Sequence, residues 1–137
     1  MLKRPIWFLL TSLALVLLIS GCGGSGKLQT RGRLLKNGAP YLLPEGDIVR
    51  VMFVPIPEGK EKVTDFHMAD FNPEDGTFQA AGKDLKGVPP GKYRIAIEHL
   101  HRRADIFKGA FDAERSPFVH DVNRSTEEIV IELAKTK

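Results

Sequence analysis

The sequence has few cysteines, no long apolar run and little net charge, and each of these absences excludes a class of protein. It has one cysteine among 137 residues, which excludes an intramolecular disulfide and a Cys-x-x-Cys metal or redox site. Its longest apolar run, residues 6–19, is shorter than the roughly 20 residues that a membrane-spanning helix needs. It also lacks a large excess of charge, because the formal net charge is only +3. With 27% charged and 42% hydrophobic residues, the composition favours a globular domain over a disordered chain or a polytopic membrane protein.

The N-terminus has the three parts of a secretory signal. Lys3 and Arg4 provide a charged start, the apolar run follows, and the small residues 20–21 precede Cys22. This order is typical of a cleavable signal peptide. We therefore predict that residues 1–21 are removed. The alternative is a single N-terminal anchor helix that stays uncleaved.

Removal of the signal would bring the charge of the protein close to zero. Lys3 and Arg4 are two of the 20 basic residues, and all 17 acidic residues follow the signal, so 18 basic residues would face 17 acidic ones. Nucleic-acid binding needs a basic footprint that such a chain does not have. The remaining chain is long enough for one hydrophobic core but not for two.

Residues 19–22, Ile-Ser-Gly-Cys, resemble the lipobox of bacterial lipoproteins. The resemblance implies a diacylglyceryl group on the Cys22 sulfur, cleavage before Cys22 and, in many bacteria, acylation of the new amine. Two or three acyl chains give a stable anchor, whereas one gives only marginal membrane binding. Gly23 stands where lipoproteins retained in the inner membrane usually have aspartate. The resemblance therefore favours the outer membrane over the inner one, with the domain facing the periplasm or the cell surface.

A free reactive thiol is the rival interpretation of Cys22. The flanking Gly/Ser residues contain no histidine, and Lys27 is five positions away, so nothing nearby would lower the thiol pKa. The stretch is instead typical of a flexible linker. We predict a lipidated cysteine and tether over residues 22–27, followed by one domain over residues 28–137.

The rest of the chain has the punctuation of a small all-β domain. Hydrophobic residues alternate in short segments, as in Tyr93, Ile95 and Ile97, and turn signals such as Asn37-Gly38 separate these segments. The predicted strands cover residues 29–35, 47–54, 64–71, 77–79, 92–100 and 127–134. No internal repeat or long helical period is present. We predict an antiparallel Greek-key sandwich of about seven strands.

Residues 104–113 are the exception to the strand pattern. Ile106, Phe107, Ala110 and Phe111 have helical spacing, but Gly109 costs a helix about 1 kcal/mol relative to alanine. We therefore expect either a short helix or an irregular segment there.

The order of the turn motifs over residues 28–134 resembles the carboxypeptidase-regulatory-like domains of bacterial proteins, which are similar to transthyretin. The matching residues are Gly32, Leu34, Gly38 and Pro40, then Asp75, Gly76 and Phe78, then Pro89, Pro90, Gly91, Tyr93 and Ile95. The chain departs from the family by inserting residues 41–46 and by a longer segment over residues 102–124. The resemblance implies a seven-stranded Greek-key sandwich with a binding, adhesive or spacer role and no active site.

His99 and His101 have the only spacing that suggests a metal site. Residues two apart share a face of a strand, so both imidazoles could reach one ion. A real site needs further ligands, which His67, His120, Asp105 or Asp121 would supply only if the fold brought them close. The plainer interpretation, which we favour, places both histidines on the rim at a strand end and predicts no metal site.

The sequence contains little to support catalysis. Ser116 and Ser125 lie outside any Gly-x-Ser-x-Gly nucleophile motif, and we predict that both are in solvated loops. The glycines after the signal do not follow a strand, so they do not form a phosphate-binding loop. We expect no enzyme activity and no cofactor, although a pair of acidic residues could still meet in the fold.

The basic stretch 99–103 is a candidate contact for an acidic partner. Arg102 and Arg103, with Arg115, would form a contact patch if the nearby aromatic residues were exposed. We favour burial instead, with Phe107, Phe111 and Phe118 forming a lid over the open end of the sandwich. The plain alternative is an ordinary solvated strand end.

We therefore expect a lipid-anchored envelope protein whose β-sandwich is a non-catalytic binding or structural module. Its expected partners are the membrane, through the lipid anchor, and an envelope protein or polysaccharide. One alternative is a ligand-binding component of a transport or sensing system that recognises a sugar, a peptide or a metal. Association through an exposed sheet edge and a small hydrolase are the others.

Overall fold

The computed structural model describes residues 26–59 and 65–133, and the statements that follow refer to these residues. The predicted signal peptide 1–21, Cys22 and most of the predicted tether lie outside them. The described chain forms the strands β1 (Arg31–Lys36), β2 (Ala39–Pro40), β3 (Ile48–Pro55), β4 (His67–Phe71), β5 (Thr77–Ala80), β6 (Gly91–His101), β7 (Ala104–Asp105), β8 (Val119–Val122) and β9 (Ile129–Glu132).

The all-β prediction is confirmed. Only β2 and β7 are as short as two residues, so seven strands have four residues or more, and the described chain contains no helical element. The hydrogen-bonded strands form one sheet in the order β2-β1-β5-β4-β3-β6-β7, with β8 also on β6 and β9 also on β1. None of the described residues belongs to a helix long and apolar enough to cross a bilayer.

The sheet contains a Greek key. Strands β3, β4 and β5 follow one another as antiparallel neighbours, and β6 then returns to lie beside β3. The pairing of β3 with β6 is the longest in the sheet and runs from Ile48 opposite Leu100 to Pro55 opposite Tyr93. This pair of strands extends from one end of the domain to the other.

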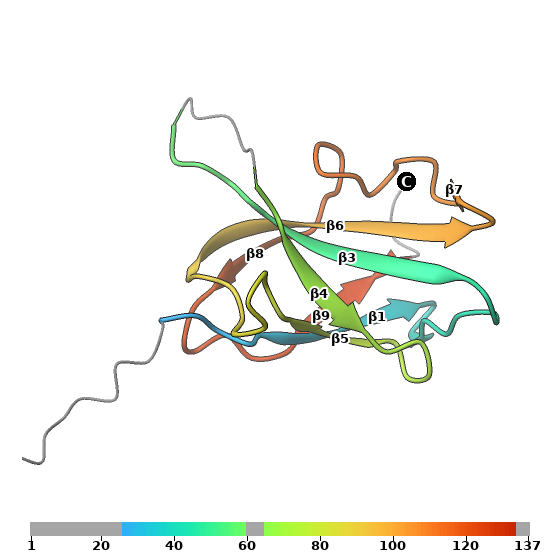
Figure 1. Ribbon diagram of the computed structural model, residues 1–137, viewed down its shortest axis with the longest axis horizontal. Coiled ribbons are helices and arrows are strands. Elements are labelled where there is room, and N and C mark those ends of the chain that lie inside the picture. Colours follow the sequence, from blue (N-terminus) through green and yellow to red (C-terminus); the bar gives the residue numbers. More distant parts are fainter. Residues whose placement is uncertain (1–25, 60–64, 134–137) are drawn as a thin grey trace, which may run out of the picture.

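The sheet folds over so that its two halves enclose the core. In Figure 1, β3 and β6 form one layer, and β1, β5 and β9 form the layer below it. The alternating residues Tyr93, Ile95 and Ile97 face inward, as predicted. Phe53 and Ile95 from the upper layer and Leu34 and Ile131 from the lower one are all fully or almost fully buried. The fold is therefore a sandwich made from one continuous sheet.

One pairing departs from the predicted antiparallel arrangement. β9 runs parallel to β1, with Gly32 opposite Ile129 and Leu35 opposite Glu132. Strand β8 was not predicted at all, because its short sequence has two polar residues at its centre, His120 and Asp121. β8 joins β6 at the other edge, so the sheet stays open between β8 and β9 within the described residues.

Residues 104–113 form the irregular segment and not the short helix. After β7 the chain makes successive turns, and Phe111 is buried among the core residues. Phe107 and Phe118 are partly buried and pack against the core. The three rings form a column, because the ring of Phe111 lies 4.9 Å from that of Phe107 and 5.5 Å from that of Phe118, centroid to centroid. The predicted burial of these aromatic residues is confirmed, because they pack in the core or against it.

Gly32 in β1 is required by close packing. It lies opposite Phe78 of β5 on one side and Ile129 of β9 on the other. A Cβ at position 32 would lie 2.2 Å from the Phe78 ring and 2.6 Å from the carbonyl oxygen of Ile129. The Phe78 ring thus occupies the space that a side chain at position 32 would need.

We predict that Gly32→Ala destabilises the domain by about 1–3 kcal/mol, because the added methyl group overpacks a site walled by backbone. Urea denaturation followed by circular dichroism would measure the change in the free energy of unfolding. Arg31→Ala, at the exposed neighbouring position of the same strand, is the matched control and should change stability little. Equal stability of the Gly32→Ala variant and the control would contradict this account of the packing.

Candidate functional site

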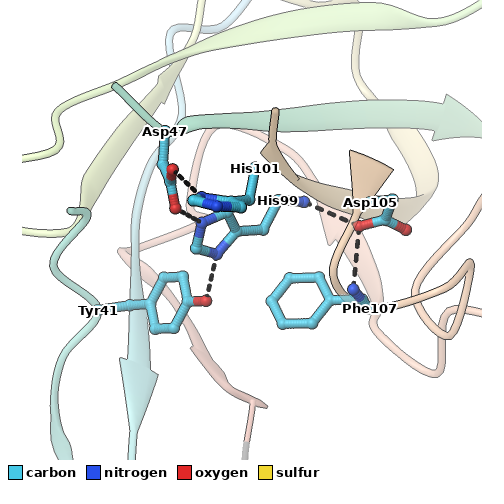
Figure 2. A network of polar contacts seen from close by, with 6 residues as sticks. All are labelled: Tyr41, Asp47, His99, His101, Asp105 and Phe107. Atoms are coloured by element: carbon cyan, nitrogen blue, oxygen red, sulfur yellow. Dashed lines mark hydrogen bonds and ion pairs between the residues drawn. The ribbon is translucent and has the colours of Figure 1, made fainter. Parts of the chain in front are cut away.

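A polar network closes one end of the sheet, where β6 ends and the chain enters β3. Residues 41–47 connect β2 to β3 past this end, and the side chains of Tyr41 and Asp47 meet those of His99 and His101 of β6 (Figure 2). The Tyr41 hydroxyl lies 2.6 Å from Nδ1 of His99, and Nε2 of the same imidazole lies 2.7 Å from Asp47 Oδ2. The other oxygen of Asp47 lies 2.7 Å from Nδ1 of His101.

The centre of the network is buried and its outer member is exposed. The side chains of His99 and Asp47 are 5% and 7% exposed, whereas that of His101 is 52% exposed. The prediction that both histidines lie on the rim is therefore wrong for His99. The alternation correctly places His99 and His101 on one face of β6, but Tyr41 and Asp47 of the connection before β3 cover His99 and remove it from solvent.

The charge of Asp47 follows from its two imidazole partners. Hydrogen bonds from His99, and then from His101, lower the pKa of the Asp47 carboxyl, and this effect exceeds the opposing effect of burial. The carboxylate therefore stays ionised and accepts one hydrogen bond on each oxygen. Burial and the nearby charge of Asp47 raise the pKa of Tyr41, so its hydroxyl stays protonated. With the Tyr41 hydroxyl as donor, Nδ1 of His99 accepts its hydrogen bond and Nε2 of His99 donates to Asp47.

Asp105 extends the network on the other side of His99. One of its oxygens accepts the backbone N–H of His99 and that of Phe107, each at 3.1 Å, and the second accepts the N–H of Gly109 at 2.9 Å. This carboxylate therefore ties β7 and the following turns to the end of β6. The Phe107 ring packs on both Tyr41 and His99, with centroid distances of 6.2 and 5.9 Å.

The network holds its central groups away from solvent. A histidine held by an aspartate is also found in nucleophilic catalysis, but here the third group is Tyr41, which is only 8% exposed. A substrate could not reach Tyr41 or His99 without opening the core. Of the three side chains Asp47, His99 and His101, only that of His101 is exposed, and the turn that follows it also faces solvent.

The turn at Arg102 and Arg103 is strained. These two residues connect β6 to β7 as a two-residue hairpin loop and have positive φ angles of 50° and 71°. Such turns favour Asn-Gly, because other side chains are disfavoured in the left-handed region. Two exposed arginines at the tip, beside His101, present positive charge to solvent. Arg115 lies elsewhere, in the segment beside the middle of β6, where its Nε is 3.5 Å from Asp112.

The remaining candidate residues do not join this cluster. His67 lies on β4 against the ring of Tyr93, and His120 lies on β8, where burial lowers its pKa. No group of three or more potential metal ligands with suitable geometry occurs among the described residues. His99 and His101 do share one face of β6, as predicted, and both imidazoles reach one partner. That partner is the carboxylate of Asp47.

The two serines differ in burial. Ser125 lies in an exposed turn, where its hydroxyl donates to Asn123 Oδ1. Ser116 is fully buried, and its hydroxyl donates to the carbonyl oxygen of Ile95. The prediction of a solvated loop is therefore wrong for Ser116, because the irregular segment packs along the edge of β6.

An apolar groove of about 690 Å³ lies on the outer face of the upper layer. Its apolar lining includes Met52 and Val54 of β3 and Phe66, which is 48% exposed although it is aromatic. Arg94 and Glu98 of β6 add one charge of each sign. The outer face of a solvated sheet is normally polar, so this groove is a second candidate site.

We predict that Asp47→Asn lowers stability at neutral pH and weakens its acid dependence. A lowered carboxyl pKa contributes stability above the ordinary pKa of about 3.9, and this contribution is lost as the pH falls through the lowered pKa. The difference in the free energy of unfolding between the wild type and the variant should therefore shrink in acid. Urea denaturation across the acid range would measure it. Glu45→Gln, at an exposed position nearby, is the charge-matched control, and a constant difference would contradict the assignment.

We also predict that the double substitution Arg102→Asn and Arg103→Gly stabilises the domain. Left-handed backbone costs roughly 1–2 kcal/mol per residue for most side chains and little for glycine, so a gain of about 1–2 kcal/mol is expected. Thermal and urea unfolding would measure the gain. Arg115→Ala removes an exposed arginine outside the turn and should leave stability unchanged. A loss of stability in the double variant would show that the arginines stabilise the turn.

Comparisons of this chain with protein-family models, with curated proteins and with solved structures find no match.

Proposed function

We propose that this protein is a lipid-anchored envelope protein whose β domain acts as a non-catalytic binding or structural module. The observation that carries the proposal is the order of motifs at the N-terminus: a charged start, an apolar run and Ile-Ser-Gly-Cys at residues 19–22. The resemblance of the domain to carboxypeptidase-regulatory-like sandwiches is consistent with this role. Outer-membrane attachment remains part of the proposal because Gly23 follows Cys22.

The connection between Cys22 and the domain is short. Leu28 is held in the domain by a reciprocal pair of backbone hydrogen bonds with Val88, of 2.8 and 2.9 Å. Six residues of fully extended chain reach at most about 20 Å, so this is the largest distance between Cys22 and Leu28. Lipidation of Cys22 would therefore hold the Leu28 end of the domain close to the bilayer.

The opposite end of the domain would lie farther from the anchor point. β6 runs from Gly91, at the Leu28 end, to His101, and its 11 residues span about 33 Å at the usual rise of a strand. This length exceeds the reach of the tether. Arg102 and Arg103 would then be free to contact an acidic partner, which we propose is an envelope protein or a polysaccharide. Arg115 lies beside the middle of β6 and could extend this contact.

A ligand-binding component of a transport or sensing system is the second candidate function. The apolar groove lined by Met52, Val54 and Phe66 favours it, because Arg94 and Glu98 place polar groups beside an exposed apolar surface. A peptide or a sugar with one apolar face would suit such a lining. The buried arrangement of His99 and Tyr41 gives no comparable support to a hydrolase.

We predict that the full-length protein, extracted from membranes, has the mass of the chain from Cys22 onward plus acyl groups. The Cys22→Ala variant should keep the signal or lose it without gaining acyl mass, because the thiol is the site of lipid attachment. Intact-mass spectrometry of both proteins measures this directly. An uncleaved, unacylated wild-type protein would overturn the proposed anchor. Ser25→Ala, in the same linker, is the control and should be processed like the wild type.

A further inference from the structure

A loop at the Leu28 end of the domain is hydrogen-bonded to the first residues that the structure describes. This loop, residues 82–87, connects β5 to the turn before β6. Lys27 Nζ lies 2.5 Å from Asp84 Oδ2, and Gln29 donates from Nε2 to the carbonyl oxygen of Leu85 at 3.1 Å. The 82–87 loop therefore lies beside the point where the chain leaves the domain toward Cys22.

Leu85 at the tip of this loop projects into solvent. Its exposed fraction is 70%, the highest of the large hydrophobic residues in the described part of the chain. Its φ angle of 60° is unusual for a leucine, because a branched side chain disfavours the left-handed region. The exposed Leu85 side chain does not pack in the hydrophobic core, and its left-handed backbone conformation does not stabilise the fold. A contact outside the domain would explain why an apolar side chain stands at this tip.

Hydrogen bonds fix the backbone of the loop, so the direction in which Leu85 projects into solvent is also fixed. The N–H of Lys86 donates to Asp84 Oδ1 at 3.1 Å, and the N–H of Gly87 donates to the carbonyl oxygen of Ala81 at 2.8 Å. Gly87 has a φ of 104° and passes so close to Leu28 that a Cβ there would lie 2.3 Å from the Leu28 carbonyl oxygen. A rigid tip needs little further ordering when it makes a contact.

The charge around Leu85 suits a lipid headgroup layer. Lys83 is neutralised by Asp65 at 2.8 Å, and Lys27 by Asp84. Lys86 follows Leu85 directly and adds positive charge at the tip. Lys92, at the start of β6, and Arg124, in the turn after β8, are exposed near the same end of the domain, where Asp121 lies opposite Lys92 in the pairing of β6 with β8. An exposed apolar residue followed by a basic one, with further basic residues at the same end of the domain, suits contact with an anionic bilayer.

We infer that the 82–87 loop rests on the bilayer to which Cys22 is anchored, with Leu85 at the boundary between headgroups and acyl chains. Lys86 then lies among the phosphates. The inference rests on the proposed lipid anchor, because the limit of about 20 Å on the distance from Cys22 to Leu28 is what brings this end of the domain to the membrane. The loop would fix the orientation of the domain, which a flexible tether alone would leave free.

A single tryptophan tests this contact in the full-length protein. The only tryptophan of the chain is Trp7, which lies in the predicted signal, so the processed protein has none. Leu85→Trp would then carry the sole tryptophan in lipidated protein reconstituted into phosphatidylethanolamine and phosphatidylglycerol vesicles, and its emission is excited selectively over that of the two tyrosines. Brominated acyl chains in the same vesicles quench a tryptophan that reaches them. Leu42→Trp is the matched control, because Leu42 is 58% exposed and lies at the opposite end, near the Asp47 network.

A blue shift and a loss of emission for Leu85→Trp in brominated vesicles, with no loss for Leu42→Trp, is the expected result. If the acyl mass is present but Leu85→Trp is not quenched, or both variants are quenched equally, the loop contact is wrong and the anchor stands. If the acyl mass is absent, the proposed function fails and the inference falls with it. Adding Lys86→Glu to Leu85→Trp should reduce the quenching, because it reverses the charge beside the tip.

Discussion

The pairing of β3 with β6 is the constraint on which the rest of this structure depends. It is the longest ladder in the sheet, and it sets the register from Ile48 opposite Leu100 to Pro55 opposite Tyr93. Every inward side chain of the upper layer takes its direction from this register, because a shift of one residue would turn the alternating hydrophobic set to the outer face. The same ladder extends from the end of the domain nearest Lys27 to the end that carries His101.

The two ends of that ladder differ in construction. At the His101 end, the carboxylate of Asp47 holds two imidazoles and seals the core with the rings of Tyr41 and Phe107. At the other end, the chain enters the domain beside a rigid loop that exposes Leu85. The turn at the His101 end has two arginines with strained backbone, and the loop at the Leu28 end has an exposed leucine. Neither feature stabilises the domain by itself, and the proposed partner contact and the proposed bilayer contact are placed at these two ends for that reason.

The candidate site could be predicted only in part. The spacing of His99 and His101 correctly placed them on one face of a strand, because side chains alternate with a period of two. It could not provide Asp47, which lies 52 residues before His99. That neighbour depends on the β3 to β6 register and on how the inserted connection folds over the strand end. For the same reason, the sequence pattern alone placed His99 on the rim when the structure buries it.

The sequence by itself determined the all-β class, most strand positions and the direction of the main hydrophobic faces, because turn residues and alternation act over a few neighbouring residues. Asn37-Gly38 and Asp75-Gly76 mark turns through their tolerance of positive φ. Only the tertiary structure decided that β9 runs parallel to β1, that β8 pairs with β6 and that Ser116 is buried. These features come from contacts between distant segments, whose free energy depends on the whole packed core and leaves no local pattern in the chain.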